Sequence, residues 1–357
     1  MIRACHSVAG ALKSKRPSGR AGVILLLLVL LLSACRPLEQ PCGPPTSDAL
    51  MQVPPGFPDV PFPADNAFTE ARWRLGKRLF YDPVLSIDGT LSCASCHKTT
   101  HAMADSLPTS PGVFDRPGKR NAPSLANVAY QPYYLREGSV PTLEMQILVP
   151  IQETNEFAHN IVDISYQLQA DSEYVRMSRE AYGRVPDPFV ITRAISTFER
   201  SLISGNSPYD QYTNCGCREA MNAAQIRGME LFFSEKTDCF RCHGGFNFTE
   251  YAFENNGLYE EYTDIGRMRF THDSTDLARF KVPSLRNLAY TAPYMHDGSM
   301  NSLRQVIDHY NSGGKSHPSK SSYIRPLKLP EQEKNDLIAF LLALGDEAFV
   351  EDQRFKP

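Results

Sequence analysis

The chain has 357 residues, of which 42% are hydrophobic and 22% charged, with a formal net charge of −3. This length favours two domains of ordinary size, and this composition can bury a core, which excludes disordered, collagen-like and multi-span membrane proteins. Residues 1–34 hold five basic residues and no acidic ones, so the remainder carries −8 and has no electrostatic footprint for a nucleic-acid partner.

Residues 1–34 are predicted to be a lipoprotein signal peptide. Their basic residues precede an apolar run, 21–32, that is too short to span a bilayer comfortably but suits a signal-peptide core. A Leu-Ser-Ala sequence then leads to Cys35, as in a bacterial lipobox, and we expect this cysteine to be acylated. The alternative is an ordinary secretory signal in which Cys35 is incidental. Either way we expect an exported protein, and with the anchor a periplasmic lipoprotein held at a membrane.

The elements after this segment are predicted to be a tether followed by helices. Residues 35–63 are rich in proline and lack helical periodicity, so we expect an extended tether. Apolar residues recur at helical spacing in 160–182 and 188–203, and a last helix begins at Pro330 and is stopped by Gly345. Strand signals are sparse. The apolar face of the last helix is predicted to be Leu337, Ile338, Leu341 and Leu342.

An internal repeat organises the body of the chain. The sequence around Asn127 returns without gaps 160 residues later around Asn287, and each copy follows a similar amphipathic helical stretch. We therefore predict two domains, 64–205 and 218–350, joined by a linker, 206–217.

Each copy of the repeat holds one Cys-x-x-Cys-His motif. Such a motif attaches a c-type haem, because two thiols add to the haem vinyl groups and the adjacent His ligates the iron. Zinc also uses Cys and His, but it would need two more ligands per motif, and no partner Cys-x-x-Cys is at hand. The motif residues are Cys93, Cys96 and His97, and Cys239, Cys242 and His243. We therefore predict two c-type haems.

Together with these motifs, several stretches resemble the bacterial di-haem cytochrome c peroxidases and their MauG-type relatives. The resemblance covers nearly all of residues 66–345. It is carried by Gly76–Pro83, Asn121–Ser124, Ser207–Asp210 and Ala292–Gly298. It implies a mainly α fold of two tandem cytochrome c-like domains, each with one covalently bound c-type haem.

The resemblance implies that Tyr310 is the distal ligand of the haem held by His243. The electron-transferring peroxidases carry Met at this position, whereas the MauG-type members carry Tyr. A phenolate oxygen is a harder donor than a thioether sulfur, so it lowers the reduction potential of the iron. The alternative, if the resemblance is set aside, is that Tyr310 is a core residue on a helix. The other candidate distal ligands are Met295, Met300 and His309.

The first haem is expected to have an open face. The 160-residue offset carries Tyr310 back onto Pro150, and proline has no donor to offer iron. Peroxidases that rest with a blocked first haem resemble one another in placing a His in the loop between the motifs, where this chain has Val113. His159 is the nearby candidate for a blocking ligand.

A pair of polar residues is expected to handle protons on this open face. The family uses a Gln and a Glu ten residues apart, which match Gln146 and Glu156. Glu156 would act as general acid–base, and Gln146 would hold the bound oxygens by hydrogen bonds. Glu153 is the alternative base, and the alternative for both residues is that they are solvated polar side chains on a loop.

One position departs from the family. Its members usually place a Trp between the haems, ten residues before the Gln, where this chain has Arg136. The single Trp of the chain is Trp73, near the start of the first copy. Tyr133 and Tyr134 could substitute as electron relays, or they could be packing aromatics.

Two further features are expected from cation and cysteine chemistry. By resemblance alone, one Ca²⁺ binds at the domain interface through Asn121 and the carbonyls of Thr291 and Pro293. In an oxidising compartment one disulfide is expected, in which Cys42 pairs with either Cys215 or Cys217. The cysteines outside the motifs and the lipobox that enter this expectation are Cys42, Cys215 and Cys217.

These observations predict a peroxidase that reduces hydrogen peroxide to water at the N-terminal haem. Electrons would arrive through the C-terminal haem from a small donor protein such as a cytochrome c. The first alternative is a MauG-type oxidase that uses peroxide to modify a partner protein; Tyr310 supports it and the missing Trp opposes it. The second alternative is a non-catalytic electron carrier with both irons six-coordinate.

Overall fold

A computed structural model describes residues 49–357 of the chain. The predicted signal peptide, Cys35 and the first part of the tether lie outside these residues. Among residues 49–357, no helix combines the length and apolar character that a membrane crossing requires.

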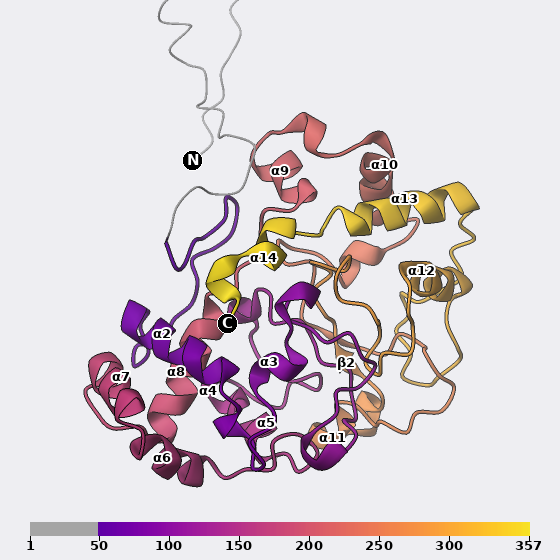
Figure 1. Cartoon of the computed structure of the whole chain (residues 1–357). Helices are drawn as coiled ribbons and strands as arrows, with labels where there is room; N and C mark the ends of the chain where they lie inside the picture. The colour runs from indigo at the N-terminus through magenta and orange to yellow at the C-terminus, as the bar shows by residue number, and fades with distance from the viewer. Residues whose placement is uncertain (1–48) are drawn as a thin grey trace, which may run out of the picture. The chain divides into compact units, whose positions relative to one another are not determined.

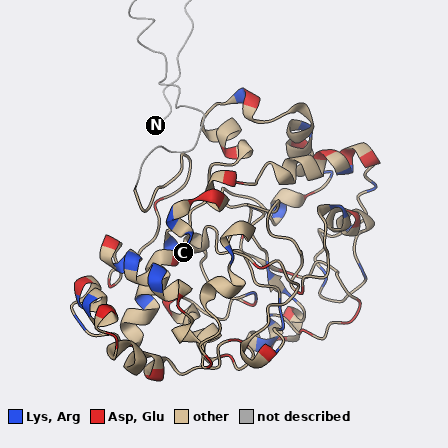
Figure 2. Ribbon diagram, in the orientation of Figure 1, with Lys and Arg blue, Asp and Glu red and all other residues tan. Residues whose placement is uncertain are grey.

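The described part of the chain is mainly helical, as expected. Its α-helices are α2 (Glu70–Tyr81), α3 (Cys93–Cys96), α4 (Leu143–Gln146), α5 (Leu148–Gln152), α6 (Ile161–Gln169), α7 (Ser172–Tyr182), α8 (Pro188–Arg200), α9 (Pro208–Asn214), α10 (Ala223–Phe232), α11 (Met268–Thr271), α12 (Leu303–Ser312), α13 (Glu331–Leu342) and α14 (Glu347–Glu351). Within residues 49–357, the one sheet pairs β1 (Phe253–Glu254) antiparallel with β2 (Phe280–Lys281). Basic and acidic residues are interspersed over these elements (Figure 2).

The first half is built on the contact between α2 and α8. Gly76 lies where the two helices meet, and a Cβ at this position would come within 1.9 Å of the Ala194 carbonyl oxygen. The two backbones therefore approach as closely as only glycine permits. The rings of Trp73 and Phe198 pack edge to face beside this contact, with centroids 5.7 Å apart. These residues belong to one large apolar core that also takes in α4, α5 and α6.

The second half repeats this construction with α10 and α13. A Cβ on Gly228 would come within 1.9 Å of the Asp336 carbonyl oxygen, and the rings of Phe232 and Phe340 lie 5.2 Å apart. A second, smaller apolar core surrounds this pair of helices. In Figure 1, α2, α6, α7 and α8 gather on one side of the body, and α10, α12 and α13 gather on the other.

The loops of the two halves also adopt matching geometry. Asn127 and Asn287 both have positive φ, 60° and 65°, a conformation that asparagine tolerates well. Their backbone N–H groups donate to the carbonyls of Leu202 (2.8 Å) and Leu344 (3.0 Å), at the ends of equivalent helices. The sequence repeat is therefore a structural repeat, whereas the domain boundaries stay a prediction.

The predicted helices need four corrections. The helix expected to be the last, α13, is followed by α14. The stretch 160–182 is divided into α6 and α7, because the Asp171 carboxylate caps α7 by accepting the N–H of Glu173. The helix expected over 188–203 ends at Arg200. On α13, Leu342 is exposed and Phe340 takes the buried place, because the helix turns this ring toward α10.

The last part of the predicted tether packs on the body. The ring of Phe57 lies 4.9 Å from that of Phe246, and the Tyr130 hydroxyl donates to the carbonyl of Pro58 (3.0 Å). The side-chain amide of Asn214 donates to the Pro55 carbonyl (3.0 Å). Within residues 49–63, aromatic contacts and side-chain hydrogen bonds therefore attach the proline-rich chain to both halves.

Candidate functional site

Both Cys-x-x-Cys-His motifs line one cavity of about 610 Å³. α3 carries the first motif, and a short 3-10 turn after α10 carries the second. The four motif cysteines are free thiols, as an attachment site for vinyl groups requires. The cavity therefore joins the two predicted haem sites across the repeat.

The two motif histidines are held in the same way. The Nδ1 atom of His97 lies 3.0 Å from the Met103 carbonyl oxygen, and that of His243 lies 3.2 Å from the Phe248 carbonyl oxygen. A carbonyl only accepts, so Nδ1 carries the proton and Nε2 keeps a lone pair for a metal. Burial lowers the pKa of both rings, that of His243 to about 4, which keeps them neutral. These residues fit a covalently bound haem in each half.

The predicted acid–base pair faces the first half of the cavity. Gln146, Pro150 and Glu156 all line it, and the Glu156 carboxylate interacts electrostatically with the Cys96 thiol. Burial of this carboxyl, and to a lesser extent the neighbouring Glu153 carboxylate, raise the pKa of Glu156. A carboxyl with a raised pKa is suited to exchange protons near neutral pH.

The loop that holds Gly112 and Val113 supports Glu156 through backbone contacts. The N–H of Val113 donates to the Glu156 carbonyl (2.9 Å), and Val113 is buried. Gly112 passes so close that a Cβ would lie 1.9 Å from the Asn155 carbonyl oxygen. His159 does not line the cavity, and its Nδ1 accepts the N–H of Asn160 (2.8 Å).

The predicted distal ligand of the second half also faces the cavity. Tyr310, on α12, interacts electrostatically with both thiols of the second motif, and burial raises its pKa to about 12. The partner of its hydroxyl is the side-chain amide of Asn256, at 3.4 Å, a weak contact. The hydroxyl thus keeps a lone pair toward the cavity.

The other candidate distal ligands differ in their positions. Met295 lines the cavity, and its sulfur lies 3.4 Å from the same Asn256 amide that contacts Tyr310. His309 does not line the cavity, and its Nε2 lies 3.0 Å from the Asn256 carbonyl oxygen. Met300 does not line the cavity either, and its backbone pairs with Tyr294. Of the four predicted candidates, Tyr310 and Met295 therefore line the cavity, as does the imidazole of His296.

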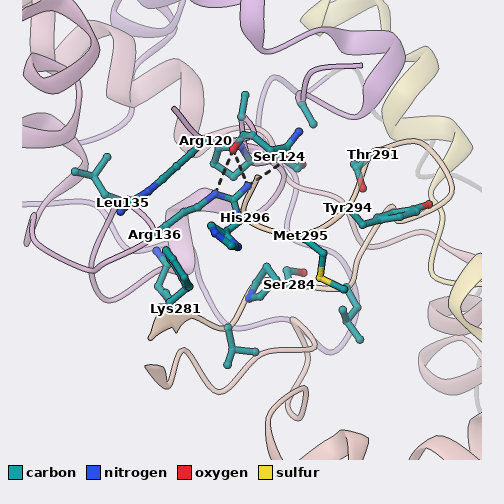
Figure 3. Close-up of a pocket in the computed structure, with 18 of the residues that line it drawn as sticks. Arg120, Ser124, Leu135, Arg136, Lys281, Ser284, Thr291, Tyr294, Met295 and His296 are labelled. Carbon is teal, nitrogen blue, oxygen red and sulfur yellow. Dashed lines mark hydrogen bonds between the residues drawn. The ribbon is translucent and has the colours of Figure 1, made fainter. Parts of the chain in front are cut away.

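Arg136, at the family's Trp position, lies at the junction of the two halves. Its Nη2 donates to the backbone carbonyl of Asn121 (2.6 Å) and to the side-chain oxygen of the same residue (3.2 Å). Thr291 and Pro293, the other residues that the resemblance assigns to calcium, line the same cavity. Figure 3 shows Arg136 among the cavity residues, together with Lys281. The guanidinium thus contacts Asn121, one of the three residues that the resemblance assigns to calcium.

The aromatic residues that could replace the inter-haem Trp have different surroundings. Trp73 belongs to the core, and its indole N–H donates to the Ser201 hydroxyl (2.8 Å). Tyr133 stacks on Phe253 with centroids 5.3 Å apart and does not line the cavity. Tyr134 is buried and does line it.

Two residues that line the cavity, Glu199 and Asn256, were not identified by sequence analysis. Glu199 is buried on α8, and its Oε2 has no hydrogen-bond partner among the described residues. Burial raises its pKa to about 8. The packing of α8 on α2 and of α13 on α10 places Leu341 at the equivalent position, so a carboxyl in one half replaces an apolar side chain in the other. Neither Glu199 nor Asn256 stands in a motif, so no sequence signal marked them.

The structure describes two cysteines outside the motifs. Cys217 is disulfide-bonded and buried, whereas Cys215 is a free thiol. Cys42, which is expected to pair with one of these two, lies outside the described residues.

Comparisons with known proteins agree on one family. A family model described as "Di-haem cytochrome c peroxidase" matches residues 70–216. The methylamine utilization protein MauG of Methylorubrum extorquens is 37% identical, over 81% of this chain and 82% of its own. Cytochrome-c peroxidase IdrP1 of Pseudomonas sp. (strain SCT) is 35% identical, over 81% of this chain and 84% of its own. The crystal structure of a MauG-like protein associated with microbial copper homeostasis has a TM-score of 0.81 and 35% identity, over 85% of this chain and 97% of that chain.

Proposed function

The chain belongs to the family of di-haem cytochrome c peroxidases and MauG proteins, and we propose that it reduces hydrogen peroxide to water in its N-terminal half with electrons drawn through its C-terminal half. It is thus an oxidoreductase of the cytochrome c peroxidase family, whose members carry two c-type haems and work in the periplasm. Anchoring through acylated Cys35 belongs to the proposal.

This proposal rests on one difference between the two repeated halves: a proline stands in the first where a tyrosine stands in the second. Pro150 in the first half and Tyr310 in the second occupy matching positions in the repeat, and both line the cavity. When bound through the two motifs, the haems supply the irons at which peroxide is bound and through which electrons pass. Pro150 offers that site no donor, so the first half leaves room for a peroxide molecule.

The chain's own residues then supply binding and proton transfer. Glu156 would accept a proton from one peroxide oxygen and deliver it to the other, which turns the departing oxygen into water. Gln146 would hold the peroxide oxygens through its side-chain amide. The Met103 carbonyl fixes the tautomer of His97, so that its Nε2 faces the cavity throughout.

Tyr310 bears on the source of the electrons. A phenolate donor lowers the potential of the second site, which makes it a poor acceptor from a small cytochrome c. The resembling MauG-type members instead take electrons from side chains of a partner protein. We therefore infer that a partner protein is the electron donor, with a cytochrome c as the alternative.

Electron paramagnetic resonance of the ferric holoprotein tests the inequality of the two sites. We expect one high-spin signal from the open first site and one low-spin signal from the second, and we expect peroxide to abolish the high-spin signal. Two low-spin signals and no reaction with peroxide would instead identify an electron carrier and contradict the proposal.

Replacement of Tyr310 by Met tests the electron source. We expect the unmodified protein to oxidise reduced cytochrome c slowly in the presence of peroxide, and Tyr310→Met to raise this rate by about tenfold or more, because a thioether raises the potential. The matched control is Tyr166→Met, since the Tyr166 side chain is 65% exposed on α6. Rapid turnover with cytochrome c in the unmodified protein would favour the alternative donor.

A further inference from the structure

The side chain of Arg136 donates hydrogen bonds to the two oxygens of Asn121 at the junction of the two halves. Its Nη2 and Nε both donate to the Asn121 carbonyl, at 2.6 and 3.2 Å, and its Nη2 also reaches the Asn121 side-chain oxygen at 3.2 Å. The backbone carbonyl of Arg136 accepts the N–H of Lys281 (2.6 Å), on β2. Arg136 therefore connects a loop of the first half to the strand pair of the second.

Within residues 49–357, no carboxylate forms an ion pair with Arg136, and Asp297, Asp264 and Glu137 act on it only at longer range. The neighbouring Arg120 is fully paired, because it makes two hydrogen bonds to Asp264 (2.6 and 2.9 Å) and a further ion pair with Glu137. The nearby Asp297 is engaged by the Tyr259 hydroxyl (2.6 Å). The described acceptors of the Arg136 guanidinium are the Asn121 oxygens, which are neutral.

The guanidinium keeps its charge at neutral pH. Burial, and to a lesser extent the charge of Arg120, lower the pKa of Arg136 to about 10. Lys281 lies beside it: its side-chain nitrogen donates to the Tyr133 carbonyl (2.7 Å) and the Gln131 side-chain oxygen, and burial, together with the charge of Arg136, lowers its pKa to about 7. Lys281 is therefore only partly protonated at neutral pH, and Arg136 is the cation that keeps its charge in this part of the cavity.

Calcium does not fit this arrangement. Ca²⁺ prefers six to eight oxygen ligands, and its affinity rises with the number of charged ligands. Asn121 and the carbonyls of Thr291 and Pro293 are all neutral, and residues 49–357 hold no cluster of three or more acidic, His or Cys side chains able to hold a metal ion. A divalent cation on these oxygens would also lie next to a guanidinium that already uses Asn121, and like charges at such distances repel strongly.

We propose that the Arg136 guanidinium is the resident cation at this junction, so that this chain neither binds calcium there nor needs it. The single exchange of Trp for Arg at this position then removes the indole between the two haem sites and supplies the positive charge that calcium would bring. The Arg136 side chain contacts Asn121 within the first half, and its backbone carbonyl accepts the N–H of Lys281 from the second half.

The unmodified holoprotein provides the first test. After dialysis we expect far less than one calcium per chain by elemental analysis, and no sensitised luminescence when Tb³⁺ is added as a calcium probe. EGTA should leave both the electron paramagnetic resonance spectrum and the thermal unfolding midpoint unchanged. One calcium per chain that survives dialysis, or a spectrum that changes with EGTA, would overturn the proposal.

Two variants of Arg136 test whether its positive charge is what excludes calcium. Arg136→Gln removes the guanidinium but keeps a polar side chain, and we expect Tb³⁺ and Ca²⁺ to bind about a hundredfold more tightly than to the unmodified protein. Arg136→Lys keeps the charge and should bind neither ion. If Arg136→Gln folds with two haems and still gains no affinity, the guanidinium does not exclude calcium and the proposal fails. If Arg136→Gln does not fold, the calcium content of the unmodified protein and of Arg136→Lys still tests the proposal: one calcium per chain in either protein would overturn it.

Discussion

Replacing Glu156 by Gln is expected to slow the reaction of the ferric holoprotein with hydrogen peroxide by about 10²–10⁴-fold, the usual contribution of a positioned general acid–base. The amide keeps the size and polarity of the side chain but cannot accept a proton from the bound peroxide. Stopped-flow absorbance of the haem bands measures this rate directly, without an electron donor.

The pH dependence of the same reaction checks the role of the carboxylate. The deprotonated form of Glu156 is the active one, so the rate falls as pH falls through its pKa. Because burial raises that pKa, the fall should begin at a higher pH than for an ordinary carboxyl, and Glu156→Gln should lose this dependence.

Glu153 offers a matched control for this variant. It lines the same cavity and is the alternative base, three residues before Glu156. Glu153→Gln should change the rate by less than about threefold, since it leaves the proton acceptor in place. A large loss in Glu153→Gln together with a small one in Glu156→Gln would assign the base to Glu153 instead.

Replacing Arg286 by Leu is expected to lower the free energy of unfolding by about 3–5 kcal/mol, because it leaves a buried carboxylate unpaired. Arg286 makes a two-pronged ion pair with Asp210, at 2.8 and 2.9 Å, and both side chains are 2% exposed. Its Nε also donates to the Phe246 carbonyl (2.9 Å), two residues before the carbonyl that orients His243. Loss of this pair should therefore broaden the spectrum of the second haem as well.

Chemical denaturation of the holoprotein measures the free energy of unfolding of Arg286→Leu. Two further variants show whether the unpaired charge causes the loss. Arg74→Leu removes an exposed helical ion pair with Glu70 and should cost no more than about 0.5 kcal/mol. The double variant Arg286→Leu, Asp210→Leu should regain much of the lost stability, since no unpaired charge remains. Equal losses in Arg286→Leu and Arg74→Leu would contradict the assigned role.

The haem-attachment residues could be predicted because their chemistry is local. Each pair of cysteines and its His lie within five consecutive residues, and the structure places both motifs on one cavity. The repeat was equally visible, because matching loops around Asn127 and Asn287 need the same backbone conformation and therefore keep the same residues. Gln146, Glu156 and Tyr310 followed from the family, and the structure brings all three to the cavity; their roles stay predictions.

Other features depend on which side chains meet across the chain. Glu199 lies on a helix whose sequence predicts only an apolar face, and its carboxyl faces the cavity because of how α8 packs on α2. Leu342 was wrongly assigned to the buried face of α13, and Phe340 was left out of it, because the rotation of α13 is set by its contact at Gly228.

The sequence by itself determined that this chain carries two covalent haem sites in a duplicated helical body, because cysteine and histidine spacing and an ungapped repeat are local properties of the chain. Tertiary structure alone decided that Arg136 meets the Asn121 oxygens and that Asn256 contacts both Tyr310 and Met295. It also decided that Glu199, whose Oε2 has no hydrogen-bond partner among the described residues, faces the first site. These contacts join residues 15 to 54 positions apart or depend on the rotation of a packed helix, and close packing of the two halves fixes them, which no local pattern records.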